Sequence, residues 1–351
     1  MTCRPFISII VPVFNVSEYI IDCIQSIAYQ DFERPLECVL VDDCGTDDSI
    51  DKARRFIDSY SGRVSFTIVS HSSNKGLSAA RNTGMRYVSG DYILFVDSDD
   101  VLPANALKTL AKPLEIEQYD VIVGRYMQIG LGDRMGRCIP GGAVFYGHDI
   151  ARHYLNDEWE VTSWNKLYRK ELLSSNALYH YDGVFFEDFL WGMKVVLAAK
   201  SLVVIDDITY YYRIRKGSIM DRKDTLEDKR RKLQDSVIVL SGLWDTFLAH
   251  GLEKDVAFHE YLERSRIGMY KYAYRNWSLF LDTYHAQRKA MPVGWKLSFQ
   301  LNGWHFTRQV RDFHLIMCPS FGGVCYYIWW HLRRYPMKFQ SLFQRFSLKT
   351  L

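Results

Sequence analysis

Apolar runs alternate with helix-like segments along the first hundred residues of the chain. Runs rich in β-branched residues predict buried strands, and these fall at Ile7–Val13, Glu37–Val41, Val64–Ser70 and Tyr92–Val96. Helical spacing and helix-start residues predict the segments between them, at Glu18–Ala28, Asp48–Ser59 and Ser78–Val88. Because strand and helix alternate, the sequence predicts an α/β fold with a mostly parallel sheet.

The pattern loosens after residue 100 and becomes helical after residue 224. The Gly-rich stretch Gly130–Gly142 is typical of a mobile loop. Further strands are expected at Asp120–Met127 and Leu202–Tyr212, and a strand or turn is expected at Trp164–Leu173. Helices are expected at Glu187–Ala199, Leu226–Gly251 and Val256–Arg275. We therefore expect two domains, an α/β domain over residues 1–216 and a mainly helical region over residues 217–351.

Charge is divided unequally between these two parts. Residues 1–212 carry 20 basic and 29 acidic side chains, and residues 213–351 carry 24 and 12, so net charges of −9 and +12 leave +3. The 48% hydrophobic and 24% charged residues are typical of a globular protein and exclude a disordered one. An acidic front and a basic, aromatic rear predict two different roles.

The cysteines and apolar segments favour a cytoplasmic protein. The 7 cysteines include no CxxC pair, which is typical of reduced thiols. The first residues hold no signal-peptide-like apolar run, and no run of about 18 apolar residues predicts a membrane span. We therefore expect a cytoplasmic location, with peripheral attachment to the inner face of the cell membrane as a separate hypothesis.

Three carboxylates follow the fourth predicted strand. In FVDSDD, Phe95–Asp100, the side chains of Asp97 and Asp99 point to the same side if the backbone stays extended. Paired oxygen ligands suit Mg²⁺ or Mn²⁺, which also contact substrate phosphates. The simpler interpretation is a capped turn, since aspartate is common in turns. Three acids directly after an apolar strand favour the metal site.

Other polar residues follow neighbouring strands, at the sheet edge where α/β proteins bind ligands. Asp42 and Asp43 end the second strand and suit either a nucleoside site or an ordinary Asx turn. Arg81 and Asn82 follow a Gly-containing loop. A guanidinium beside a carboxylate–metal cluster suits a diphosphate. The alternative is a surface helix on which Arg81 forms an ion pair.

Four strings in this order resemble the inverting glycosyltransferases of family 2, above all the capsule, O-antigen and exopolysaccharide transferases. They are VPVFN at Val11–Asn15, VDDCGTDDS at Val41–Ser49, NKGLSAARNTG at Asn74–Gly84 and FVDSDD at Phe95–Asp100. A weaker resemblance continues to about residue 220, through Trp164–Tyr168, Glu187-Asp188, Tyr212-Arg213 and Ser218.

The resemblance implies a GT-A nucleotide-sugar-binding fold and a metal-dependent transferase. Its donor would be a nucleotide sugar, with UDP as the expected nucleotide. Its acceptor would be a hydroxyl of a glycan or lipid-linked saccharide, in the synthesis of a surface polysaccharide.

The same resemblance assigns roles to individual residues. Asp43 is expected to bind the uracil edge, in a pocket that Asp42 and Asp47 help to shape. Asp97 and Asp99 form the DxD element, with Asp99 as the expected direct ligand of Mn²⁺ or Mg²⁺. The residues assigned to the nucleotide are Pro12, Asn15, Asp42, Asp43, Arg81, Asn82 and Asp97.

An inverting transfer also needs a carboxylate that deprotonates the acceptor hydroxyl. Glu187-Asp188 follows an apolar run and opens a predicted helix, where acidic residues also favour the helix dipole. In the context of the family, Asp188 is the expected base, and Glu187 is expected to orient the acceptor.

Four further candidates have equally simple structural interpretations. Arg213 and Arg215 suit the diphosphate or form a solvated basic linker. Trp164 and Lys166 suit the sugar or acceptor, although the core is the simpler place for Trp164. The histidines show no metal-ligand spacing. His71, at the end of the third predicted strand, is placed either near the nucleotide or at the surface, and the surface is the simpler expectation.

The rear region mixes aromatic and basic residues as interfacial membrane segments do. The run Tyr326–Arg334 is followed by Lys338, Phe339, Phe343, Arg345, Phe346 and Lys349. Packing of helices on the catalytic domain or on a second subunit explains this composition equally well. Nucleic-acid binding is the third interpretation, and the motifs of the front half argue against it.

Two other functions fit part of the sequence. FVDSD resembles the nucleophile strand of Mg²⁺-dependent phosphohydrolases of the haloacid-dehalogenase kind. That function leaves Asp42, Asp43 and Arg81 without roles and expects the DxD near the amino terminus. The other is a non-catalytic sugar-nucleotide-binding protein, against which the intact DxD and Glu187-Asp188 argue.

Overall fold

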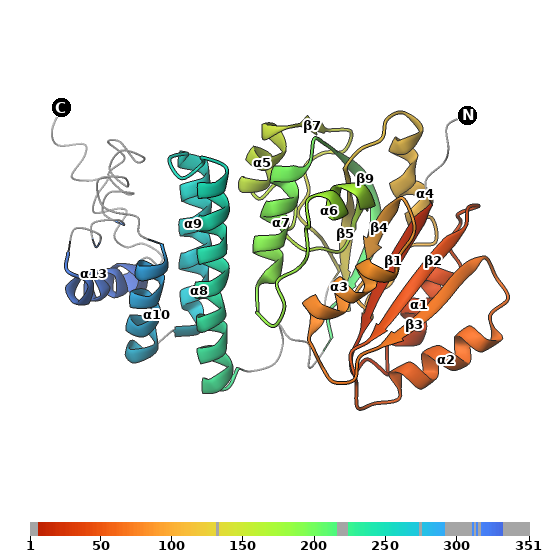
Figure 1. The fold of residues 1–351 in the computed structure, drawn as a ribbon, viewed down its shortest axis with the longest axis horizontal. Helices are drawn as coiled ribbons and strands as arrows, with labels where there is room; N and C mark the ends of the chain where they lie inside the picture. The colour runs from red at the N-terminus through yellow and green to blue at the C-terminus, as the bar shows by residue number, and fades with distance from the viewer. Residues whose placement is uncertain are drawn as a thin grey trace. The chain divides into compact units, whose positions relative to one another are not determined.

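The computed structural model describes residues 6–130, 133–215, 224–273, 276–291, 311, 314 and 317–332. The chain divides into two compact units, Met1–Asp224 and Thr225–Leu351, which Figure 1 draws as an α/β unit and a helical unit. The boundary expected at residues 216–218 lies outside the described residues, so the domain limits 1–216 and 217–351 stay a prediction.

The first unit is built on one mixed sheet. Its strands are β1 (Ile7–Val13), β2 (Leu36–Asp42), β3 (Val64–Ser70), β4 (Tyr92–Phe95), β5 (Val121–Ile129), β6 (Arg134–Met135), β7 (Val144–Tyr146), β8 (Lys166–Arg169) and β9 (Ser201–Arg213). They lie in the order β3-β2-β1-β4-β8-β5-β9-β7, with β6 paired to β5. The strands β1 to β4 are parallel, as predicted. Next to them, β8 runs antiparallel to both β4 and β5, and β9 is parallel to β5.

Four of the seven described helices of this unit, the first three and the last, begin and end within two residues of the predicted positions, and the other three were not predicted. The seven helices are α1 (Ile20–Ala28), α2 (Ser49–Ser59), α3 (Leu77–Tyr87), α4 (Ala106–Ala111), α5 (His148–Leu155), α6 (Lys170–Ser175) and α7 (Glu187–Ala198), with a 3₁₀ turn η1 (Lys112–Glu115). The stretch Gly130–Gly142, expected to be a mobile loop, contains β6 and also Cys138, which forms a bridge with Trp159.

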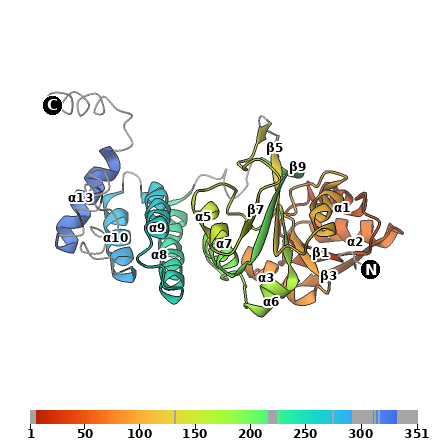
Figure 2. The same ribbon diagram turned by 90° about the horizontal axis from the view of Figure 1, so that it is seen from above.

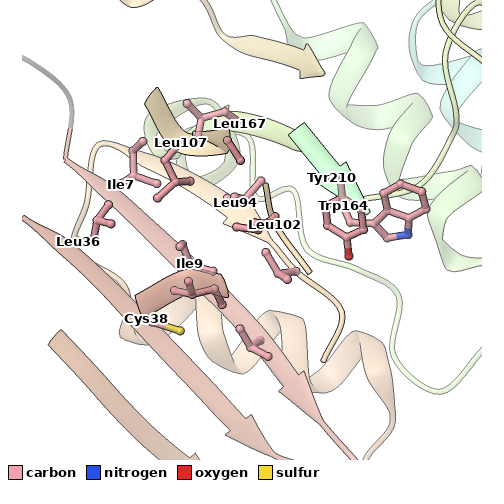
Figure 3. Packing of buried hydrophobic residues seen from close by; sticks show 14 of the residues in the cluster. Ile7, Ile9, Leu36, Cys38, Leu94, Leu102, Leu107, Trp164, Leu167 and Tyr210 are labelled. Atoms are coloured by element: carbon pink, nitrogen blue, oxygen red, sulfur yellow. The ribbon is translucent and has the colours of Figure 1, made fainter. Parts of the chain in front are cut away.

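Helices cover both faces of β1, which is why all its residues are buried. Ile7, Ile9 and Val11 lie on one face, in a hydrophobic core that includes residues of α1 and α4 (Figure 3). Ile10 lies on the other face and meets α3, so that α1 and α3 lie on opposite sides of the sheet (Figure 2). A Cβ on Gly84 of α3 would lie 2.3 Å from Ile10, so only glycine permits this approach.

The second unit is helical and has its own aromatic core. Its elements are α8 (Leu226–Ala249), α9 (Val256–Met269), η2 (Tyr270–Ala273), α10 (Trp277–Ala290) and α13 (Pro319–Leu332). Tyr270 stacks on Phe280 with ring centroids 4.4 Å apart, and Tyr326 and Trp330 of α13 are buried beside them. No helix among the described residues is long and apolar enough to cross a membrane.

Candidate active site

Asp43, directly after β2, is held by three donors. Its Oδ1 accepts from His71 Nδ1 at 2.7 Å and from the Lys75 amide at 2.8 Å, and its Oδ2 accepts from the Gly76 amide at 2.8 Å. His71 Nε2 lies 2.9 Å from Thr83 Oγ1 of α3. The side chain of His71 is only 5% exposed, so the expectation of a surface histidine is wrong.

The loops after β1 and β2 are joined beside Asp43. Asn15 Oδ1 accepts from the Thr46 amide at 2.7 Å. Asp42 Oδ1 accepts from the Cys44 amide at 3.1 Å, so an Asx turn does form here, but Asp42 makes it and not Asp43, for which it was considered. Pro12 is buried in β1. The structure therefore brings the predicted nucleotide residues of these two loops to the same edge of the sheet.

Arg81 of α3 lies at the centre of the acidic residues. Its Nη2 donates to Asp97 Oδ1 at 3.0 Å, and its Nη1 donates to Glu187 Oε1 at 3.3 Å and Asp188 Oδ1 at 3.2 Å. The Arg81 side chain is 1% exposed. One buried guanidinium thus gathers carboxylates from the end of β4 and from the start of α7.

Burial and the nearby charges shift the pKa values of this cluster. Burial alone would lower the pKa of Arg81, but the charges of Asp188, Asp97 and Glu187 raise it, so the guanidinium stays charged. Burial, and then the charge of Asp188, raises the pKa of Glu187 to about 7. Burial also raises the pKa of Asp97, against the attraction of Arg81. Three acids facing one fixed cation leave a local excess of negative charge.

Asn82, the neighbour of Arg81, is fully occupied by the protein. Its Nδ2 donates to the His180 carbonyl and to Asp182 Oδ1, both at 2.8 Å, and its Oδ1 accepts from the His180 amide at 2.8 Å. Asn82 is 3% exposed. The structure therefore shows it positioning the segment before α7, and its contact with a nucleotide stays a prediction.

Asp100 joins the DxD loop to β9. Its Oδ2 accepts from Tyr210 Oη at 2.7 Å, and its Oδ1 accepts from the Arg213 amide at 2.7 Å. Tyr210 Oη in turn accepts from the Asp97 amide at 3.0 Å. Burial, together with the charges of Asp99 and Asp97, raises the pKa of Asp100 well above its usual range. The sequence offered no signal for this contact, because Asp100 and Tyr210 are far apart in the chain.

Arg213 and Arg215 lie near the acidic residues rather than in a free linker. Arg215 Nε donates to Asp99 Oδ2 at 2.6 Å, and Arg213 Nη2 donates to Asp22 Oδ2 at 3.0 Å. Both guanidinium groups lie over the ring of Tyr19, at 5.1 Å and 5.3 Å from its centroid. Their position is compatible with a diphosphate that Asp99 and a cation would hold.

Trp164 and Lys166 lie on a second side of the site. Trp164 stacks on Tyr210 at 4.7 Å and on Tyr212 at 5.3 Å, and it is part of the main core (Figure 3). Lys166 Nζ donates to the Thr162 carbonyl at 2.6 Å, and burial lowers the pKa of Lys166 to about 8. Both residues line a pocket that also includes Glu160.

Non-glycine residues with positive φ flank these loops. Asn15 has φ 52°, Cys44 58°, Asn165 60° and Phe186 68°. Asparagine tolerates this region, but an aromatic residue rarely adopts it. Strained backbone of this kind is concentrated at functional sites, and Phe186 directly precedes Glu187.

The DxD carboxylates suit a cation bound together with a diphosphate. Asp97 Oδ1 and Asp99 Oδ2 pair with Arg81 and Arg215, and these bonds do not use Asp97 Oδ2 or Asp99 Oδ1. Among the described residues, no group of three or more His, Cys, Asp or Glu side chains has the arrangement of a metal site. Mg²⁺ and Mn²⁺ commonly need only one or two carboxylates beside phosphates and water, so the donor set fits them.

The comparison with known proteins agrees with this arrangement. Residues 8–175 match the family model described as Glycosyl transferase family 2. Glycosyltransferase GlyG of Streptococcus pneumoniae is 30% identical over 250 residues, which cover 66% of this chain and 81% of GlyG. TarS of Staphylococcus aureus, a poly(ribitol-phosphate) beta-N-acetylglucosaminyltransferase, is 30% identical over 213 residues, which cover 60% of this chain and 35% of TarS. The match thus spans about a third of the length of TarS.

Solved structures share the fold. The crystal structure of TarS 1–349 in complex with UDP-GlcNAc has a TM-score of 0.67 at 20% identity and covers 91% of this chain and 89% of that one. Mannosyltransferase PcManGT from Pyrobaculum calidifontis, in complex with GDP-Man and Mn²⁺, has a TM-score of 0.51 at 19% identity, covering 82% and 73%. The predicted GT-A fold is confirmed, and the chain belongs to glycosyltransferase family 2.

Proposed function

We propose that this enzyme transfers a sugar, with inversion, from a UDP-linked donor to a hydroxyl of a glycan or lipid-linked saccharide during surface polysaccharide synthesis. One observation carries the proposal: Arg81 holds the DxD residue Asp97 and the acids Glu187 and Asp188 on a single guanidinium. The residues expected at the leaving group and at the acceptor are therefore assembled in one place. A phosphohydrolase of the haloacid-dehalogenase kind gives Arg81, Asp42 and Asp43 no role.

The proposed transfer is a single displacement at the anomeric carbon. The acceptor oxygen forms a bond to that carbon, while the bond from the carbon to the diphosphate oxygen breaks and its electron pair leaves with UDP. The acceptor proton moves to Asp188, whose side chain is 20% exposed and so remains accessible. Glu187, on the same helical turn, is proposed to orient the acceptor.

The DxD residues are proposed to serve the leaving group. Mn²⁺ or Mg²⁺ at Asp97 and Asp99 would supply positive charge for the diphosphate. Arg213 and Arg215 are proposed to contact the same diphosphate, because Arg215 already pairs with Asp99. Trp164 and Lys166, which line one pocket, are proposed to contact the sugar or acceptor.

The contacts of Asp43 support uracil as the base. An ionised carboxylate offers about four acceptor positions, and His71, Lys75 and Gly76 use three of them. The remaining position on Oδ2 suits a donor such as N3–H of uracil, whereas cytosine presents an acceptor there. TarS, which shares the fold, was solved in complex with UDP-GlcNAc.

The enzyme is expected to be stabilised by UDP in a metal-dependent way. A ligand at about 100 times its Kd adds about 2.7 kcal/mol, which is a rise in Tm of roughly 5–10 °C for a domain of this size. The measurement is a thermal shift of the full chain with UDP, GDP, CDP or ADP, with and without Mn²⁺. We expect the largest shift with UDP and Mn²⁺ together.

Two variants sharpen this experiment. Asp99→Asn should remove the Mn²⁺-dependent part of the UDP shift, and Asp207→Asn, at an exposed position of β9, should keep it. The same Mn²⁺ effect in the Asp99→Asn variant would contradict the metal assignment. No shift with any nucleotide would contradict the proposed function.

For the second unit, we propose a membrane contact through only part of its aromatic and apolar side chains, the exposed ones of α13. Tyr326 and Trp330 are buried in the core of the unit itself, so these two side chains are not exposed to a membrane. Phe321 and Ile328 of α13 are 54% and 52% exposed, and their spacing of two turns places them on one helix face. The basic residues that follow α13, from residue 333 to residue 351, lie outside the described residues.

Co-sedimentation with vesicles of phosphatidylglycerol and phosphatidylcholine tests this contact. A truncation at Thr283 would cut α10, so point variants are the cleaner choice. Phe321→Ser combined with Ile328→Ser should weaken binding about tenfold or more, since each side chain contributes about 1.5–3 kcal/mol on burial. Ile116→Ser, at an 87% exposed position of the first unit, is the control. Equal pelleting of all three proteins would end the hypothesis.

A further inference from the structure

A chain of hydrogen bonds leads from a buried histidine to the proposed base. His180 Nε2 lies 2.8 Å from Ser163 Oγ, and Ser163 Oγ lies 2.5 Å from Asp188 Oδ1. Ser163 is fully buried and His180 is 3% exposed. Neither residue belongs to the strings that resemble the family in the front half of the chain.

The single hydroxyl hydrogen of Ser163 decides the direction of these bonds. A serine hydroxyl donates once, and Asp188 Oδ1, which also accepts from Arg81 Nη1, receives that donation. His180 Nε2 must then carry the hydrogen that it shares with Ser163 Oγ. Burial and the charge of Arg81 lower the pKa of His180 well below its usual range, so the ring is neutral with Nδ1 unprotonated. Buried Nδ1 has no hydrogen-bond partner, in agreement with this tautomer.

The ring of His180 is fixed on its other sides. It stacks on Trp191 with centroids 4.3 Å apart and planes at 13°, and it meets the edge of Phe95 at 5.4 Å. Both backbone groups of His180 are bound by Asn82. The histidine is therefore a rigid support for the Ser163 hydroxyl.

The two oxygens of Asp188 have different surroundings as a result. Oδ1 accepts from Ser163 and from Arg81 Nη1. Oδ2 takes no part in either bond. The other charged groups around the carboxylate are Glu187 on the same helix, Asp97 and Lys166.

We propose that Ser163, supported by His180, is a positioning residue that holds Asp188 by Oδ1, so that Oδ2 is the oxygen that receives the acceptor proton. This inference rests on the proposed role of Asp188 as base. It adds two residues to the site and assigns the reacting atom. Neither Ser163 nor His180 touches the substrate in this role.

The tautomer of His180 tests the hydrogen-bond chain without an activity assay. Nitrogen NMR of the full chain labelled at histidine distinguishes a neutral ring protonated at Nε2 from one protonated at Nδ1. The chain has 10 histidines, and the signal of His180 is identified by its loss in His180→Phe. We expect Nε2–H, and an Nδ1–H or doubly protonated ring would overturn the proposal.

Kinetics test the consequence for catalysis. With the UDP-sugar that wild type turns over, Ser163→Ala should lower kcat roughly 10-fold to 100-fold, the scale of a misplaced catalytic group, while KM for the donor stays unchanged. In the Asp188→Asn background, the same substitution should cause no further loss, because no base remains to be positioned. A merely structural loss would lower kcat in both backgrounds. Ser8→Ala is the matched control, since Ser8 is fully buried at the amino-terminal end of β1, and it should keep wild-type kcat.

The outcomes separate this inference from the proposed function. A wild-type kcat in Ser163→Ala would overturn the positioning role while the transferase function stands. A rise in the KM for the donor as large as the fall in kcat would do the same. Absence of UDP release from every UDP-sugar by wild type would contradict the proposed function. The tautomer measurement then still decides on the hydrogen-bond chain.

Discussion

Asp188→Asn is expected to lower kcat for glycosyl transfer by roughly 100-fold to 10,000-fold, the usual contribution of a general base, while UDP binding stays at the wild-type level. The amide keeps the shape of the carboxylate and still offers an oxygen to Arg81 and Ser163. It cannot accept the acceptor proton. The measurement pairs steady-state transfer with UDP titration of the same preparation.

Asp207→Asn is the control for this variant. Asp207 is an exposed residue of β9, and its substitution should leave kcat and the Kd for UDP at wild-type values. Full transfer by Asp188→Asn would show that another group is the base. A loss of UDP binding equal to the loss of transfer would show that Asp188 binds the nucleotide and is not the base.

Arg81→Met is expected to cost about 3–5 kcal/mol of unfolding free energy, the range for removal of one partner from a buried ion pair. The reason is that Asp97, Glu187 and Asp188 would face one another without their shared cation. Arg81→Lys should recover only part of the loss, because an ammonium lacks the planar fork that reaches three carboxylates. Urea unfolding of the three proteins gives the comparison.

The loss in Arg81→Met should depend on pH. Burial and the charge of Asp188 already raise the pKa of Glu187 from the ordinary 4.5 to about 7, and removal of Arg81 raises it further. A carboxyl whose pKa is higher in the folded than in the unfolded state loses stability as pH rises between the two values. The variant should therefore be closest to wild type near pH 5 and furthest from it near pH 8.

Arg86→Met controls for the loss of an arginine from α3. Arg86 is exposed on the same helix and lies over the ring of Tyr179 at 5.8 Å, so its removal should cost less than about 0.5 kcal/mol. Equal losses of unfolding free energy for Arg81→Met and Arg86→Met would contradict the proposal that Arg81 neutralises the three buried acids. So would a loss in Arg81→Met that is independent of pH.

The front half of the fold was predictable because β-branched runs and turn residues mark its strands. β1 and β3 begin and end at the predicted residues, since β-branched runs and their turn residues mark both limits. The antiparallel strand β8 was not predictable. Only Lys166–Arg169 form it, and a run of four residues carries no periodicity that separates a strand from a turn.

The residue types of the candidate site were chosen from the sequence, but their hydrogen-bond partners could not be. The carboxylates of Asp97, Glu187 and Asp188 were expected near substrate, and Arg81 was expected beside the carboxylate–metal cluster and the diphosphate. Local patterns do not show that one arginine binds all three acids, because its contacts with Glu187 and Asp188 span 106 and 107 residues of chain. His71 shows the same limit, since it follows β3 and its partner Asp43 follows β2.

Arg81 and Asn82 are adjacent in the chain, and together they hold both ends of one segment. Asn82 binds the backbone of His180, and Arg81 binds Glu187 and Asp188. Residues between these two anchors are largely exposed or half-buried, among them Tyr181 and Asp182. An insertion between the anchors would lengthen the rim of the site without displacing its acids. Variation of acceptor preference among related enzymes, or by design, is therefore best sought in the length and composition of this span.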